Sequence, residues 1–378
     1  MSPGSVSAVV EAANPAEPST WSATLREAQL NGIGQRWADT AVNAEDYVRR
    51  PVVLFMHGWP ESWFSWRHQL RAAAAAGYVG VAPDMRGYGG TYAPAHSAEY
   101  TVYSLAGDML ALLQHLGVRR AALVGHDHGA NLGWKLALLH PRVFPCYVAM
   151  SVPYGGRPRA PPLETFRSTY GDERQPETDP SFFYMLHHCL PSAGADYARG
   201  GRAVFQSIYG DPRDADPPEV TSRRLFVEGV PEPAWRRERR PQRLLPWISQ
   251  GEVDYYVSEF ERSGWEGGLN WYRVLDLDWV VTPQLDGRRL EQPVAFIAGS
   301  RDPVLNMYGG VESLGSLFGR TCVRQPTVCL LEGAGHWIQQ ERPDAVNTLL
   351  FEFLTEHLAA FAHSPNERAS SVGPSSRL

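Results

Sequence analysis

The segment Gly125–Gly129, with the sequence GHDHG, constrains the fold of this 378-residue chain more than any other feature. An apolar run at 121–125 leads into it, and a helical pattern at 130–139 follows it. Two glycines around a central nucleophile, placed between a strand and a helix, are typical of the strained turn called a nucleophile elbow. The segment therefore predicts a sheet flanked by helices, with Asp127 projecting above the sheet.

An aspartate at the nucleophile position decides which chemistry the chain can support. The free N–H groups at the start of a helix favour an anion, so Asp127 is expected to stay ionised. A carboxylate that attacks a saturated carbon bearing a leaving group forms an alkyl ester, which water can then cleave. Two alternatives are an ordinary tight loop and a metal site on His126, Asp127 and His128. The metal site is disfavoured because no further ligand motif lies nearby.

Two further residues complete the order nucleophile, acid, base along the chain. Asp302 lies three residues beyond an apolar run that ends at Gly299, and His336 lies on a glycine-rich loop after the run at 327–331. Active sites of open α/β sheets form at the carboxyl ends of the strands. The pattern therefore predicts a triad in which Asp302 orients His336 and His336 acts as the base for Asp127.

The segment His57–Pro60, with the sequence HGWP, follows the apolar run at 51–57, which should lie beside the elbow. Its backbone is placed to supply one oxyanion donor, the N–H of Trp59, and the N–H of His128 is expected to supply the other. A cis bond before Pro60 would fix this turn.

The rest of the chain alternates short apolar runs with amphipathic stretches, the pattern of an α/β fold with a mostly parallel central sheet. The expected strands are 51–57, 78–83, 121–125, 146–152, 293–299 and 327–331, and the expected helices are 62–76, 102–116, 130–139 and 343–360. We expect a flexible lead-in over 1–22, a core over 23–153 and 293–362, a mainly helical inserted cap over 154–292, and a disordered tail over 363–378.

Composition excludes several classes of function. The chain carries 35 basic and 41 acidic residues, a net charge of −6, so nucleic acid is not an expected partner. The arginine run at 236–240 is interpreted as a solvated surface. No apolar stretch reaches the length of about 18 residues that a membrane span needs. Four scattered cysteines, with no C-x-x-C pair, indicate reduced thiols and a cytoplasmic protein.

The chain ends in Ser376-Arg377-Leu378, which is similar to the peroxisomal import tripeptide of the small–basic–Leu type. An exposed polar tail is what an import receptor requires. In a eukaryotic cell the sequence therefore predicts a peroxisomal location and an import receptor as partner.

Several motifs together resemble those of soluble epoxide hydrolases of the α/β-hydrolase superfamily, over about Pro51 to Leu354. They are HGWPESWFSWRHQL (57–70), APDMRGYGG (82–90), GHDHGA (125–130), GLNWYR (268–273), AGSRDPV (298–304) and GHWIQQERP (335–343). The resemblance implies hydrolysis of an epoxide to a vicinal diol through an ester on the nucleophilic aspartate, with no cofactor or metal.

The resemblance also implies further site residues. Tyr272 matches one of two cap tyrosines that donate hydrogen bonds to the epoxide oxygen, and Tyr184 is the better match for the other. Glu61, in the loop that begins at His57, resembles a residue that helps to hold the hydrolytic water. The chain departs from the family at His128, where tryptophan is common, and the departure should make the pocket floor more polar.

Two rival functions remain open. A haloalkane or haloacid dehalogenase shares the Asp–His–Asp triad, but it needs paired N–H donors for the halide, commonly including a tryptophan at the position of His128. A catalytically silent ligand-binding protein could share the fold, although a complete triad argues against it.

Overall fold

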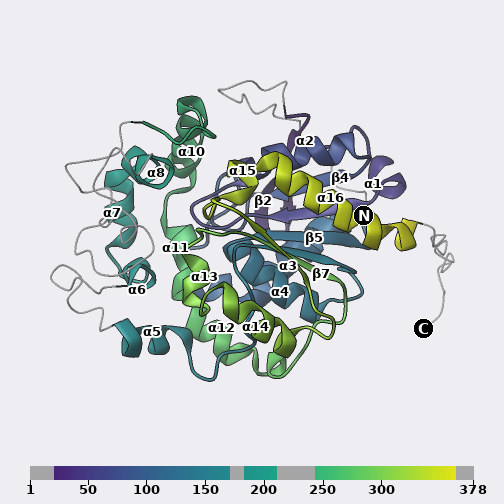
Figure 1. Cartoon of the computed structure of the whole chain (residues 1–378). Helices are drawn as coiled ribbons and strands as arrows, with labels where there is room; N and C mark the ends of the chain where they lie inside the picture. The colour runs from purple at the N-terminus through teal and green to yellow at the C-terminus, as the bar shows by residue number, and fades with distance from the viewer. Residues whose placement is uncertain (1–20, 171–182, 211–242, 363–378) are drawn as a thin grey trace, which may run out of the picture.

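The computed structural model describes residues 21–170, 183–210 and 243–362 (Figure 1). Its centre is a sheet of eight strands in the order β1-β2-β4-β3-β5-β6-β7-β8. The strands are β1 Thr24–Leu30, β2 Ile33–Asp39, β3 Val52–Met56, β4 Val79–Pro83, β5 Ala121–His126, β6 Tyr147–Met150, β7 Val294–Gly299 and β8 Thr327–Leu331. β2 is antiparallel to β1 and β4, and all other neighbours are parallel. The mostly parallel sheet predicted from the sequence is confirmed.

Helices cover both faces of the sheet, which explains why every residue of β3, β4, β5, β6 and β7 is buried. The helix α16 packs against α2 on one face, and α3 packs against α4 on the other (Figure 1). The helical elements of this core are α1 Asp46–Arg49, η2 Trp63–Trp66, α2 Arg67–Ala75, η3 Ser97–Tyr100, α3 Val102–His115, α4 His128–Leu139, α13 Val304–Met307, η7 Val311–Ser313, α14 Leu314–Thr321, α15 Ile338–Glu341 and α16 Pro343–Ala362.

A helical cap is inserted between β6 and β7, as the sequence predicts, and much of it lies to the left of the sheet in Figure 1. Its described elements are α5 Pro162–Tyr170, α6 Tyr184–His188, α7 Ala193–Gly200, α8 Arg202–Tyr209, α10 Gln250–Ser263, α11 Glu266–Arg273, α12 Leu275–Val281 and η6 Pro283–Leu285. The boundaries at 154 and 292 stay a prediction.

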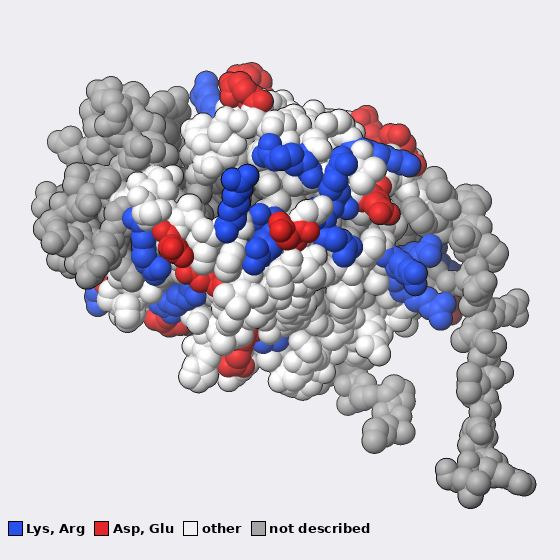
Figure 2. Space-filling model, turned by 90° about the horizontal axis from the view of Figure 1, so that it is seen from below, with Lys and Arg blue, Asp and Glu red and all other residues white. Residues whose placement is uncertain are grey.

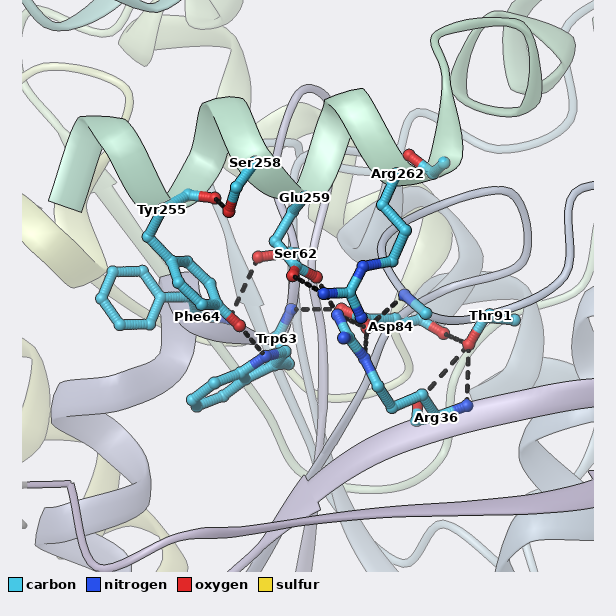
Figure 3. Close-up of polar contacts among 12 residues, drawn as sticks. Arg36, Ser62, Trp63, Phe64, Asp84, Thr91, Tyr255, Ser258, Glu259 and Arg262 are labelled. Atoms are coloured by element: carbon cyan, nitrogen blue, oxygen red, sulfur yellow. Dashed lines mark hydrogen bonds and ion pairs between the residues drawn. The ribbon is translucent and has the colours of Figure 1, made fainter. Parts of the chain in front are cut away.

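The cap helix α10 is fixed to the core by buried ion pairs. Glu259 pairs with Arg36 of β2, and Arg36 also pairs with Asp84, which follows β4 (Figure 3). One face of the same helix carries Glu252, which accepts a hydrogen bond of 2.8 Å from Arg67 Nε in the core. Because charges removed from water must be paired, these contacts hold α10 in one position against the sheet.

The hairpin formed by β1 and β2 is absent from the sequence-based prediction, which begins its strands at Pro51. Its turn is Asn31-Gly32, with φ angles of 49° and 79°. Asn-Gly with positive φ at both residues is the preferred two-residue connection between antiparallel strands. The Asn31-Gly32 turn was visible in the sequence. The strands on either side of it were not recognised because they are rich in polar residues, and β2 even buries Gln35 and Arg36.

Three other expectations lie outside the described residues: residues 1–20 of the flexible lead-in, the arginine run at 236–240, and the tail at 363–378 with its final tripeptide. Over the surface seen in Figure 2, acidic side chains lie among the basic ones. All four cysteines are free, as expected of reduced thiols. Among the described helices, none combines the length and the apolar character that a bilayer crossing requires.

Candidate active site

The turn between β5 and α4 holds Asp127 with φ 53° and ψ −120°, a conformation that residues other than glycine rarely adopt. The glycines on either side make this turn fit. A Cβ atom on Gly125 would lie 2.4 Å from the carbonyl oxygen of Gly129, and a Cβ atom on Gly129 would lie 2.1 Å from the carbonyl oxygen of Met56. The backbone therefore accepts strain at the residue whose carboxylate it presents, as in a nucleophile elbow.

The structure brings the three residues of the predicted triad together. Nε2 of His336 lies 3.5 Å from Oδ2 of Asp127, and Nδ1 lies 3.1 Å and 3.0 Å from the two carboxylate oxygens of Asp302. Asp302 follows β7 and His336 follows β8, so adjacent strand ends hold the pair. The side chain of Asp127 is 14% exposed, whereas that of Asp302 is fully buried. The imidazole thus lies between an accessible carboxylate and a buried one.

Opposite charges stabilise one another in this triad. Burial alone would raise the pKa of Asp127, but the hydrogen bond from His336 and the nearby imidazoles hold it well below its usual range. Burial alone would lower the pKa of His336, but the negative charges of Asp302 and Asp127 and the hydrogen bonds to them raise it to about 10. At neutral pH, Asp127 is therefore a carboxylate beside an imidazolium.

The loop after β3 supplies a hydrogen bond to Asp127. The N–H of Trp59 donates to Oδ1 of Asp127 over 3.0 Å, and the Trp59–Pro60 bond is cis, as predicted. A Cβ atom on Gly58 would lie 2.3 Å from the Cβ atom of Asp127, so only glycine allows this approach. Among the contacts that the described residues make, the N–H of His128 gives no hydrogen bond to Asp127. The roles of both N–H groups as oxyanion donors therefore stay predictions.

Beneath the elbow, Glu61 connects several parts of the site. Oε2 of Glu61 accepts from the N–H of Gly58 over 2.7 Å and lies 2.9 Å from Nδ1 of His126, while Oε1 accepts from Nε2 of Gln339 over 2.8 Å. The other ring nitrogen of His126 lies 2.8 Å from the carbonyl oxygen of His336. Burial alone would raise the pKa of Glu61, but the His126 imidazole lowers it. Glu61 and His126 therefore link the Trp59 loop to the backbone of His336.

No supporting role was assigned to His126 from the sequence. The available signal was a histidine on a strand that is otherwise apolar and buried, where a polar side chain needs partners.

His57 has a local role instead. Its Nε2 accepts from the N–H of Met85 over 3.0 Å, so its Nδ1 carries the proton and donates to the carbonyl oxygen of Gly58 over 2.9 Å. His57 thereby holds the loop that carries Trp59.

The two cap tyrosines singled out from the sequence lie side by side. Tyr184 is the first residue of α6 and Tyr272 belongs to α11, and their ring centroids are 6.4 Å apart. Burial, and then the charge of Asp127, raise the pKa of both phenols well above the ordinary value, so both keep their protons. Burial, and then the charge of Asp127, also raise the pKa of Tyr308 to about 12.

The ring of His128 lies against Tyr272, with centroids 4.4 Å apart and planes at 84°. Burial lowers the pKa of His128, so the ring is neutral at neutral pH. His128 therefore gives the pocket a polar but uncharged edge. Within the described part of the chain, no group of three or more His, Cys, Asp or Glu side chains is arranged to hold a metal ion.

The chain matches a known fold family and several proteins of known function. Residues 51–343 match the family model described as alpha/beta hydrolase fold. Epoxide hydrolase A of Mycobacterium tuberculosis is 39% identical over 318 residues, which cover 81% of this chain and 90% of that protein. Epoxide hydrolase 1 of Siraitia grosvenorii is 34% identical over 309 residues, which cover 81% and 92%.

Among solved structures, epoxide hydrolase A from Mycobacterium thermoresistibile superposes with a TM-score of 0.77 at 35% identity, over 88% of this chain and 98% of that one. An epoxide hydrolase from Vigna radiata superposes with a TM-score of 0.74 at 34% identity, over 89% and 99%. With the aspartate elbow, these likenesses establish that the chain belongs to the epoxide hydrolases of the α/β-hydrolase family.

Proposed function

We propose that the chain hydrolyses epoxides to vicinal diols, with Asp127 as the nucleophile. One observation carries the proposal: a carboxylate, not a hydroxyl, occupies the elbow within reach of an Asp302–His336 pair. Such a carboxylate can form and then lose an alkyl ester. The relatives named epoxide hydrolases support this choice of substrate.

In the first step, Asp127 attacks one carbon of the oxirane ring and the bond from that carbon to oxygen breaks. An alkyl ester forms on Asp127, and the alkoxide takes a proton from Tyr184 or Tyr272. A phenol suits this step because it binds the oxygen as a donor and gives up its proton only as negative charge develops. The resting imidazolium of His336 then restores the phenol and becomes a neutral base.

The second step uses the neutral imidazole. Esterification removes the negative charge of Asp127, one of the causes that raise the pKa of His336, so the ring can now act as a base. His336 takes a proton from water, and the hydroxide attacks the ester carbonyl while the N–H groups of Trp59 and His128 stabilise the oxyanion. The bond between the ester carbonyl carbon and the alkyl oxygen then breaks. The leaving alkoxide takes the proton held by His336, and the new carboxylic acid of Asp127 returns a proton to the imidazole, so the diol departs and the carboxylate and the imidazolium are restored.

The proposal is tested with terminal, styrene-type and fatty-acid epoxides, assayed with the wild type and with Asp127→Ala. The wild type should form diols, and loss of the nucleophile should lower kcat at least about 10⁴-fold. Asp286→Ala removes an exposed carboxylate and serves as the matched control, with activity unchanged. Release of halide from haloalkanes without diol formation would instead identify a dehalogenase, and binding of epoxides without turnover would indicate a silent ligand-binding protein.

The peroxisomal address expected at Ser376-Arg377-Leu378 stays a prediction. A fluorescent fusion that keeps this carboxyl terminus, expressed in a eukaryotic cell, should collect in peroxisomes, and removal of the tripeptide should return it to the cytoplasm. An even cytoplasmic distribution of the intact fusion would contradict the prediction.

A further inference from the structure

Two ring nitrogen atoms beside the proposed active site have no hydrogen-bond partner among the residues that the structure describes. They are Nε1 of Trp59 and Nδ1 of His188. Trp59 is 5% exposed and His188 is 1% exposed, so neither ring is open to bulk water. A buried polar group without a partner is costly and therefore uncommon in folded proteins. Two of them on neighbouring rings call for an explanation.

The two rings lie next to the tyrosines proposed to hold the epoxide oxygen. The centroids of Trp59 and His188 are 4.4 Å apart, and the centroid of His188 is also 4.4 Å from that of Tyr272. Tyr184 lies 5.3 Å from His188, one turn earlier on α6. The unpaired nitrogens therefore belong to the same aromatic wall as both phenols.

The hydrogen bonding of His188 indicates which of its nitrogens carries the proton. Nε2 lies 2.6 Å from the hydroxyl of Tyr197. A phenol is the better donor and an imidazole nitrogen the better acceptor, so Nε2 accepts and the proton resides on Nδ1. Burial, with the nearby His187, lowers the pKa of His188 well below its ordinary value, in agreement with a neutral ring. Both unpaired nitrogens are then N–H donors, since an indole nitrogen can only donate.

We infer that Trp59 and His188 form a subsite of two N–H donors that binds an acceptor oxygen in the non-reacting part of the substrate. The subsite favours epoxides that carry an ether, carbonyl or hydroxyl oxygen close to the oxirane ring over hydrocarbon epoxides of the same shape. A site built around buried donors discriminates against a ligand that leaves them unpaired. This inference rests on the proposed epoxide hydrolysis and names the substrate class of that same site.

The test compares benzyl glycidyl ether with its carbon isostere, in which a methylene group replaces the ether oxygen. The ratio of kcat/KM for the ether to kcat/KM for the isostere is measured in the wild type, in His188→Phe and in His188→Gln. Phenylalanine keeps a ring without a donor, and glutamine keeps a donor without a ring. His187→Phe, which makes the same change at the next residue of α6, is the matched control. Thermal unfolding of each variant reports its folding.

The ratio should fall about fivefold or more in His188→Phe, mainly through the ether, and should lie nearer the wild-type value in His188→Gln and His187→Phe. If His188→Phe does not fold, His188→Leu takes its place. A folded donor-free variant with the wild-type ratio would overturn the subsite, even though both substrates are turned over. A purely structural role would lower both values of kcat/KM together and leave the ratio unchanged. A wild type that converts neither epoxide would instead refute the proposed function.

Discussion

Asp127 and His336 carry opposite charges in the resting site, and their atoms approach to 3.5 Å. The interaction links catalysis to stability, because it stabilises the imidazolium and the carboxylate together. The raised pKa of His336, about 10 against an ordinary 6.5, means that the folded state holds this proton more tightly than the unfolded state does. The stabilisation is therefore complete below pH 6.5 and is lost as the pH rises towards about 10.

Asp127→Asn should weaken the dependence of folding stability on pH between 6.5 and about 10. The substitution keeps the size of the side chain but removes the charge that helps to raise the pKa of His336. The free energy of unfolding, measured with urea between pH 6.5 and about 10, should then fall less steeply than in the wild type. Asp286→Asn, at an exposed carboxylate, should leave the slope unchanged. Equal slopes in Asp127→Asn and the wild type would show that the pair is not coupled.

At the element scale, the elbow depends on the close approach of α4 to the end of β3. Gly129→Ala places a methyl group against the carbonyl oxygen of Met56, which is backbone and has to move. We expect a loss of about 2 kcal/mol or more in stability and of about 100-fold in kcat/KM, because the nucleophile shifts with the turn.

Gly315→Ala provides the control for this change. Gly315 lies in α14 with ordinary φ, and an added Cβ atom would meet nothing within 4 Å. The substitution should be neutral or stabilise the protein by up to about 1 kcal/mol. Chemical denaturation measures the stability of both variants, and steady-state kinetics measure their kcat/KM. Gly129→Ala with wild-type stability and activity would contradict the account of the elbow.

The helix α10 carries one carboxylate that pairs with the core and another that pairs with a residue of the cap. The side chain of Glu259 is 3% exposed and pairs with Arg36 (Figure 3), whereas Asp254 on the same helix is 45% exposed and pairs with Arg202. Glu259→Gln should cost about 2 kcal/mol in stability, since Asp84 still pairs with Arg36, and Asp254→Asn less than about 0.5 kcal/mol. Urea unfolding measures both, and equal losses would show that the buried pair does not anchor the cap.

Local sequence predicts the residues that follow strands better than those that depend on distant contacts. Asp127, Asp302 and His336 were predictable as neighbours because each follows a strand, and parallel strands bring their carboxyl ends to one edge of the sheet. The positions of His126 and His188 in the site were not predictable. Each contacts a partner far away in the chain: His126 lies beside Glu61, and His188 lies beside Trp59. Local sequence carries no information about which distant side chain packs against such a residue.

In the whole molecule, the candidate site lies where the α/β core and the inserted helical cap meet. The core places Asp127, Asp302 and His336 directly after its strands, and the cap places Tyr184 and Tyr272 on α6 and α11 (Figure 1). Buried ion pairs at α10 hold the two layers together. In the proposed reaction, Asp127 approaches an oxirane ring from the core while the phenols of the cap donate to its oxygen, the arrangement that ring opening by displacement requires.

The proposed mechanism esterifies the substrate temporarily to Asp127, so the path of the oxygen atoms tests it. Excess enzyme is given one turnover of epoxide in ¹⁸O-labelled water, then digested, and the peptide that contains Asp127 is weighed by mass spectrometry. If water attacks the ester carbonyl, one ¹⁸O atom appears in the Asp127 carboxylate and the diol of that first turnover is unlabelled. Label in the diol, with none in the peptide, would mean that water attacks the epoxide directly and would contradict the account.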